Sequence, residues 1–205
     1  MRGRRRAGAL VTAALLGAGC AHLGRGRAVP ECPGELVASG AIEGEFLLRQ
    51  RWSVERGGET FTLEVVAQKR GDELVLVGLH PLGAKLFTLR QRGIETRVEA
   101  APAPALEVPP LDVLRDLHRA RFLAPAGAGG DGRTSERRDG TEISEWREGG
   151  RLRERSFRRL ADDRLVTLRF DEPAPGGGDA ARVEIENAWC GYRAEVTTLS
   201  EQALP

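Results

Sequence analysis

Apolar side chains alternate with polar ones along two neighbouring stretches, residues 45–55 and residues 59–68. A period of two predicts β-strands that have one covered face and one solvated face. Gly57 and Gly58 separate the two stretches and suit a tight turn, so we expect a hairpin. The covered positions are Phe46, Leu48, Trp52, Val54, Phe61, Leu63, Val65 and Ala67.

Three more strand-like runs follow at residues 74–79, 85–90 and 94–99, and short turns separate them. Sequential strands joined by short turns favour an antiparallel meander of four or five strands. The proline-rich stretch 100–110 interrupts the meander, because proline cannot donate to a sheet ladder.

Residues 111–122, LDVLRDLHRARF, have the apolar spacing of a helix. Leu111, Leu114 and Leu117 form a stripe with Val113 and Ala120 beside it. Pro110 stands where a helix tolerates proline, at its start. We expect the stripe to pack on the sheet, and the opposite side, with Arg115, Asp116 and Arg119, to be polar.

The second half of the chain reads as a mobile connection, residues 123–133, followed by five more strand-like runs. Together the two halves predict an α+β fold of about nine to eleven antiparallel strands with one inserted helix. A twisted sheet of this size tends to curl, and the helix would then lie across its concave side over an apolar hollow. The five runs are residues 141–148, 151–159, 164–171, 182–190 and 191–199.

The N-terminus has the order of an export signal: arginines, then a short apolar segment, then small residues before Cys20. This pattern resembles the lipobox of bacterial lipoproteins, in which the cysteine receives a diacylglycerol and becomes the first residue of the mature chain. Residues 1–19 are then a signal peptide, and residues 20–33 are the lipidated cysteine and a flexible tether. An ordinary secretory signal with a chance cysteine, or a buried helix, is the alternative.

Removal of the signal changes the charge of the chain from +1 to −3, with 27 basic and 30 acidic residues remaining. Such a surface has no broad basic field for nucleic acid, so no nucleic-acid partner is expected. The remaining length fits one domain, residues 34–200. Cys32 and Cys190 lie near its two ends, and the sequence leaves open whether they form a disulfide or stay as two free buried thiols.

Three segments, residues 74–91, 109–122 and 182–199, resemble a family of bacterial lipoproteins of unassigned function that occurs in some genomes beside genes for aryl polyene pigments. Within them, Pro81-Leu82-Gly83 before an alternating strand, the proline-led helix, and a closing strand that ends in Trp189 are similar to LolB, the outer-membrane receptor of lipoprotein sorting. This resemblance implies the fold that LolB shares with the periplasmic carrier LolA, an unclosed barrel with a helical lid over a cavity for acyl chains. The charged half, residues 134–159, departs from that receptor.

The sequence offers no recognisable catalytic, metal-binding or cofactor-binding group. His22, His80 and His118 are expected on the surface, without a nucleophile or a second histidine at metal spacing. The glycine-rich stretches do not join a strand to a helix, so they predict loops and not phosphate sites. We therefore expect a protein that is not an enzyme and holds no metal or cofactor. The alternative that the sequence leaves open is an enzyme that uses a pair of Asp or Glu residues far apart in the chain.

Arginines and acidic residues alternate between residues 133 and 159. This pattern favours solvated strand faces with exposed ion pairs, and the alternative is a grip on anionic headgroups or an acidic partner. The tract comprises Arg133, Arg137, Arg138, Arg147, Arg151, Arg153, Arg155, Arg158 and Arg159, with Glu136, Asp139, Glu142, Glu145, Glu148 and Glu154.

Two functions fit this sequence. The first is a lipoprotein anchored through Cys20 to the periplasmic face of the outer membrane, with an acyl chain or another hydrophobic moiety as ligand and envelope transport proteins as partners. Ala21 in place of aspartate after the cysteine favours the outer over the inner membrane. The second is a structural or accessory lipoprotein that docks a partner complex and has no cavity. The expected lining residues are Phe46, Leu48, Trp52, Val54, Phe61, Leu63, Val65, Leu114 and Leu117.

Overall fold

The computed structural model describes residues 32–100, 108–171 and 182–205. The predicted signal peptide, Cys20, His22 and most of the predicted tether lie outside these residues. Cys32 and Pro33, the last two residues assigned to the tether, are held by the folded domain, because Cys32 is buried and the Pro33 carbonyl accepts a hydrogen bond from Arg119. Residues 34–45 contain no strand, only a short 3-10 turn, η1 (Ser39–Ala41).

The first half of the chain forms the predicted meander. In the hairpin of its first two strands, Trp52 lies opposite Leu63 and Val54 opposite Phe61, so the alternating apolar side chains share one face. Gly57 and Gly58 in the turn have φ of 60° and 85°, which side chains with a Cβ rarely adopt. The strands are β1 (Phe46–Arg56), β2 (Glu59–Arg70), β3 (Glu73–Leu79), β4 (Lys85–Arg92) and β5 (Glu95–Ala100).

The described residues of the second half, 108–171 and 182–205, contain six strands, one more than the sequence predicts. The additional strand is β6, which begins inside the stretch expected to be a mobile connection. Trp189 and Cys190 also differ from expectation, because they lie in the turn before the last strand and not at the end of a strand. The strands are β6 (Gly132–Arg138), β7 (Thr141–Glu148), β8 (Arg151–Arg159), β9 (Leu165–Phe170), β10 (Arg182–Asn187) and β11 (Tyr192–Ala203).

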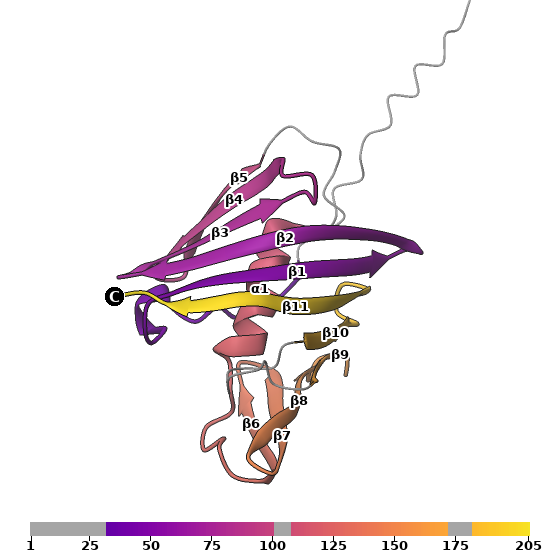
Figure 1. The fold of residues 1–205 in the computed structure, drawn as a ribbon. Coiled ribbons are helices and arrows are strands. Elements are labelled where there is room, and N and C mark those ends of the chain that lie inside the picture. Colours follow the sequence, from indigo (N-terminus) through magenta and orange to yellow (C-terminus); the bar gives the residue numbers. More distant parts are fainter. Residues whose placement is uncertain (1–31, 101–107, 172–181) are drawn as a thin grey trace, which may run out of the picture.

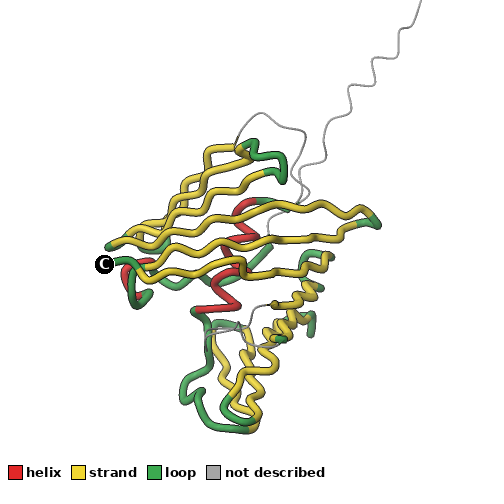
Figure 2. The backbone as a smooth tube through the Cα atoms, viewed as in Figure 1, coloured by secondary structure: helices red, strands yellow, loops and turns green. Residues whose placement is uncertain are grey.

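All eleven strands belong to one antiparallel sheet with the order β5-β4-β3-β2-β1-β11-β10-β9-β8-β7-β6. The two halves of the chain meet where β1 pairs with β11, and β5 and β6 are the two unpaired edges. The chain passes from one edge to the other through α1 (Pro110–Arg121), so the helix must cross the open side of the curled sheet (Figure 1). The fold is therefore the expected α+β architecture, an unclosed antiparallel sheet with one main helix across it (Figure 2).

The hydrophobic core lies between the inner face of the sheet and α1. Alternate residues of the long strands point inward, for example Leu48, Trp52 and Val54 of β1, and they pack in one cluster with Leu114 and Leu117 of the helix. None of the helices among the described residues has the length and apolar character that crossing a bilayer would need.

Candidate functional site

The nine residues expected to line an apolar hollow gather between the sheet and α1. Eight of them are buried in the single core cluster, with exposed fractions between 0 and 8 %. Phe61, at the hairpin end of β2, is half-buried and packs against the same cluster. Side chains that are this well covered fill the space around themselves, so a ligand could reach them only if α1 or neighbouring side chains moved. Their role in ligand binding stays a prediction.

Helix α1 has no exposed residue along its length. The expectation that Asp116, His118 and Arg119 lie on a solvated side is wrong, because their exposed fractions are 0, 0 and 1 %. Two parts of the structure cover these residues: residues 33–37 contact His118 and Arg119, and Asp116 lies against Asn187 and Tyr192 at the ends of β10 and β11.

The carboxylate of Asp116 is the centre of a buried polar cluster on the covered side of α1. Its Oδ1 accepts a hydrogen bond of 2.6 Å from Arg119 Nη1, and its Oδ2 accepts one from the hydroxyl of Tyr192. Asn187 Nδ2 donates to the same hydroxyl at 3.1 Å, and the Arg119 guanidinium lies 4.8 Å from the centroid of the Trp189 ring. Because a buried charge is costly unless it is paired and hydrogen-bonded, these contacts fix the position of α1 on β10 and β11.

The same cluster changes the acidity of Tyr192. Burial raises the pKa of the Tyr192 phenol well above its usual range, and the neighbouring Asp116 carboxylate raises this pKa further. Tyr192 therefore stays protonated and acts as a hydrogen-bond donor at any physiological pH.

His118 joins α1 to the chain on both of its sides. The backbone N–H of Val37 donates to Nδ1 at 3.0 Å, and Nε2 lies 2.9 Å from Oε1 of Gln91 on β4. Because Nδ1 accepts, Nε2 must bear the hydrogen of a neutral imidazole. Burial lowers the pKa of His118 to about 4, so the ring stays neutral near pH 7. His80, in contrast, is exposed beside the β3–β4 turn, as the sequence predicts.

Arg155 of β8 binds the C-terminal end of α1. Its Nη1 donates to the backbone carbonyls of Arg119 and Ala120 at 2.6 and 2.9 Å, and its Nε donates to Glu145 at 2.6 Å. The last carbonyls of a helix lack partners within it and bear partial negative charge, so a guanidinium group stabilises this end. Arg155 and Glu145 are buried and correct the expectation that the whole charged tract is solvated.

Other pairs in the tract match that expectation, because they involve partly or largely exposed side chains. Examples are Arg137 with Glu142 at 3.4 Å and Arg153 with Glu148 at 3.5 Å. Such pairs contribute little to stability.

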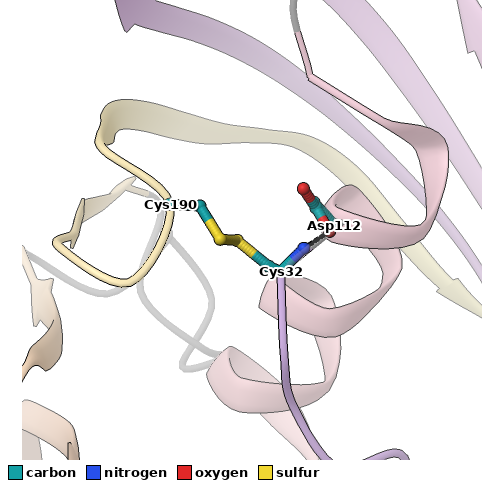
Figure 3. A group of neighbouring side chains, drawn as sticks. All are labelled: Cys32, Asp112 and Cys190. Carbon is teal, nitrogen blue, oxygen red and sulfur yellow. Dashed lines mark hydrogen bonds between the residues drawn. A yellow bond between two sulfur atoms is a disulfide. The ribbon is translucent and has the colours of Figure 1, made fainter. Parts of the chain in front are cut away.

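Cys32 and Cys190 form a disulfide with a Cα–Cα distance of 5.6 Å, beside the first turn of α1 (Figure 3). The backbone N–H of Cys32 donates to Asp112 Oδ1 at 2.9 Å, and Arg115 Nη1 donates to the same oxygen at 3.2 Å. The second oxygen, Oδ2, is buried and has no hydrogen-bond partner. Burial, against the opposing effects of these donors, raises the pKa of Asp112.

A groove of about 580 Å³ lies on the outer face of the sheet, away from α1. Apart from the buried residues Ile185 and Ala194, the side chains that line it on β1, β10 and β11 alternate in sequence with the buried ones, so they point outward. They are mostly charged and differ from the apolar lining that the sequence predicts for a ligand site. The lining includes Ser53, Glu55, Arg169, Glu184, Arg193 and Glu195.

The polar contacts that hold α1 were missed by sequence reasoning. The spacing of Asp112 with Arg115 and of Asp116 with Arg119, three residues in each case, was the one available signal, but exposed helices have the same spacing. The partner Tyr192 lies 76 residues from Asp116 in the chain, and no local pattern connects them.

A family model described as "Protein of unknown function (DUF3261)" matches residues 47–200. A comparison with curated proteins found no match. Among solved structures, a LolA superfamily protein from Nitrosomonas europaea aligns with a TM-score of 0.47 and 12 % identity over 82 % of this chain and 91 % of that one.

Two further solved structures give similar values. A DUF1329 family protein from Desulfovibrio piger aligns with a TM-score of 0.40 and 13 % identity, over 80 % of this chain and 87 % of its own. A domain from Vibrio parahaemolyticus, described as that of an outer membrane lipoprotein-sorting protein, aligns with a TM-score of 0.42 and 14 % identity, over 81 and 88 %. These values assign no activity to the chain.

Proposed function

We propose that this protein, which belongs to the DUF3261 family of proteins of unknown function, binds an acyl chain or another hydrophobic moiety during lipid or lipoprotein transport in the cell envelope. Membership of the family itself assigns no activity. The proposed site is the apolar space between α1 and the inner face of β1 and β2. The proposed partners are the ligand and the envelope transport proteins that deliver or receive it.

One observation supports this proposal above all: in the part of the chain that the structure describes, one 12-residue helix crosses the concave face of an eleven-stranded sheet that has two open edges. The inner face beneath the helix is mostly apolar along β1 and β2, where Gln50 and Lys69 are its two polar members, so displacement of α1 would expose a largely hydrophobic surface. Transfer of an alkyl chain from water to such a surface gains about 0.8 kcal/mol per methylene group. Useful affinity would then need no catalytic group, metal or cofactor.

Helix α1 is held by two kinds of contact. Leu114 and Leu117 pack in the apolar core, and His118, Asp116 and the carbonyls that accept hydrogen bonds from Arg155 make polar contacts around it. Ligand entry by displacement of α1 would have to separate both kinds of contact while the hydrogen bonds within the helix stay intact.

The proposed location is the periplasmic face of the outer membrane, with attachment through a lipid on Cys20. The support is the sequence around Cys20: an arginine-rich start, a short apolar segment and small residues before the cysteine. Ala21 supports the outer membrane over the inner membrane.

A second function, that of a structural or accessory lipoprotein that docks a partner complex, is favoured by the burial of the interior. Leu48, Val54 and Leu114 have exposed fractions of 0 %, so the protein's own side chains cover these positions. On this view the sheet is a scaffold, and function belongs to its outer surface.

Ligand uptake distinguishes the two functions. The chain from residue 21 onward is purified, extracted for lipid analysis by mass spectrometry, and titrated with a fluorescent 16-carbon fatty acid. Transport predicts a co-purified lipid and saturable binding of one probe per chain. Phe61→Glu, at the half-buried end of the core, should weaken binding, whereas Leu160→Glu, at an exposed position, should leave it unchanged. A folded chain that contains no lipid and takes up no probe would instead support the accessory function.

A further inference from the structure

We propose that the Cys32–Cys190 disulfide is a site of thiol–disulfide exchange with a dithiol, in which Asp112 gives a proton to the Cys32 sulfur and takes it back on reoxidation. This inference is independent of whether the interior binds a lipid. It concerns the place where the start of the described chain, the β10–β11 turn and α1 meet (Figure 3).

The geometry places one carboxyl group against both sulfur atoms. A carboxylate oxygen of Asp112 and the two Sγ atoms all lie within 4.8 Å of one another. Oδ1 is engaged by the Cys32 N–H and by Arg115, whereas Oδ2 is buried without any partner. A buried acceptor without a partner costs about 1–3 kcal/mol, so packing alone does not account for this carboxyl group. A proton on Oδ2 that can be passed to a neighbouring sulfur does account for it.

The two sulfur-bearing residues differ in accessibility. Cys32 is 1 % exposed and lies against the helix, whereas Cys190 is partly exposed in the β10–β11 turn. An external thiolate therefore reaches Cys190, and Cys32 is the leaving group on the buried side, next to Asp112.

Each bond and proton in the exchange is accounted for. The dithiol's first thiolate forms a bond with Cys190 Sγ while the Cys32–Cys190 bond breaks. Cys32 leaves with the electron pair and takes the proton from the Asp112 carboxyl, which stays ionised until reoxidation returns that proton from Cys32. The second thiol of the dithiol loses its proton to solvent and attacks the mixed disulfide, which releases Cys190 as a thiolate. The dithiol is oxidised to its cyclic disulfide, and the protein disulfide is reduced by two electrons.

Several charged and titratable groups face this carboxyl and the disulfide. Arg115 lies on Oδ1, and Asp116, one turn further along α1, opposes ionisation of Asp112. Tyr192 of β11 interacts with Asp112 electrostatically, and Arg56 of β1 donates to the carbonyl of Cys190 at 3.1 Å. Arg119 lies on the same side of α1, paired with Asp116. Burial opposes the charged form of Asp112 more than its donors favour it, which raises the pKa of this carboxyl above that of an exposed aspartate.

The test is the rate of reduction of the full chain in detergent by dithiothreitol between pH 5 and pH 9. Alkylation of the Cys32 and Cys190 peptides is followed by mass spectrometry, and each rate is divided by the concentration of reductant thiolate. The wild-type rate per thiolate should fall as the pH rises, because Asp112 loses its proton. Asp112→Asn keeps the shape of the side chain but cannot give a proton. Its rate per thiolate should be independent of pH and, at low pH, at least about tenfold lower than that of the wild type.

Gly78→Ala is the matched control for stability, because it should destabilise the remote β3–β4 region without touching the disulfide. Its pH profile should match that of the wild type, with the rate per thiolate unchanged. Flat profiles in both the wild type and Asp112→Asn would overturn the proposal. Reduction that is independent of dithiothreitol concentration, or that follows the free energy of unfolding in all three proteins, would also overturn it, since the disulfide would then open only on unfolding.

Discussion

The hydroxyl of Tyr192 donates a hydrogen bond to Oδ2 of Asp116, a residue 76 positions earlier in the chain. This bond joins the last strand of the sheet to the helix that crosses it, and both side chains are buried. It therefore links the strand through which the two halves of the sheet meet to the helix that lies across the concave face.

Tyr192→Phe should lower the free energy of unfolding by about 2–3 kcal/mol, because it leaves a buried, charged oxygen of Asp116 without its donor. Asn187 also loses the hydroxyl that accepts its hydrogen bond. Urea denaturation followed by circular dichroism measures the change. Arg193→Gln, which removes an exposed ion pair with Glu186, is the control and should change stability by less than about 0.5 kcal/mol. Equal effects of the two substitutions would show that the buried hydrogen bond contributes no more to the free energy of unfolding than an exposed ion pair does.

Acidification should destabilise the protein through His118. Well above pH 6.5, the usual pKa of histidine, the imidazole is neutral in both states and its contribution to stability is complete. Between pH 6.5 and about 4 the His118 imidazole is protonated in the unfolded chain but stays neutral in the folded chain, so the free energy of unfolding falls as the pH falls. The loss amounts to about 3 kcal/mol, since each pKa unit corresponds to about 1.4 kcal/mol.

The pH dependence of urea midpoints tests this contribution. In His118→Gln the extra loss of stability between pH 6.5 and pH 4 should disappear, although the variant is less stable at pH 7 because Val37 N–H loses its acceptor. An exposed control, His80→Gln, should keep the wild-type slope. A wild-type slope in His118→Gln as well would assign the effect to other groups.

The disulfide should stabilise the domain by constraining the unfolded chain. Cys32 and Cys190 are 158 residues apart, and the chain-entropy model gives about 5 kcal/mol for a loop of this length. We expect Cys190→Ser to lower the free energy of unfolding by about 2–5 kcal/mol, measured by urea denaturation without reductant. Addition of a reductant should then destabilise the wild type but not the variant. A variant as stable as the oxidised wild type would contradict this expectation.

Gly78 should be intolerant of a larger residue for a steric reason. A Cβ at this position would lie 2.1 Å from Cε1 of Phe87, in a ring that is fully buried on the neighbouring strand. Gly78→Ala should therefore cost about 1–3 kcal/mol, as overpacked cores do. The double variant Gly78→Ala, Phe87→Leu should recover part of the loss relative to Phe87→Leu alone, in a double-mutant cycle of urea midpoints. Strict additivity would mean that the ring moves aside without cost.

Much of the fold could be predicted, because the residues on the covered face of the sheet can be identified from the sequence of each strand alone. The alternation that places Trp52 opposite Leu63 is visible in each strand by itself, and the apolar stripe of α1 is visible in the spacing of Leu111, Leu114 and Leu117. Strand β6 could not be predicted in this way, because GRTSERR contains no apolar side chain and its pairing with β7 defines it.

The candidate site likewise has a part that the sequence predicts and a part that it does not. Its apolar members share one core, as their spacing predicts, since each needs only a covered face. The buried state of Asp116 and His118 could not be predicted, because their partners Tyr192, Val37 and Gln91 come from distant parts of the chain. Polar residues on a helix predict a solvated face, and only the tertiary structure shows that Asp116 lies against β10 and β11 and that His118 lies between Val37 and Gln91.

Attachment to the membrane depends on a residue outside the described part of the chain, Cys20. If its thiol accepts a diacylglycerol, Cys20→Ser should move the protein from the membrane fraction to the soluble fraction and abolish incorporation of labelled palmitate. Cys32→Ser is the matched control, because its sulfur is paired with Cys190 and cannot accept a lipid while the disulfide is intact. That variant should remain membrane-bound and labelled. Label that persists in Cys20→Ser, or loss of label in Cys32→Ser, would refute the assignment of the lipid to Cys20.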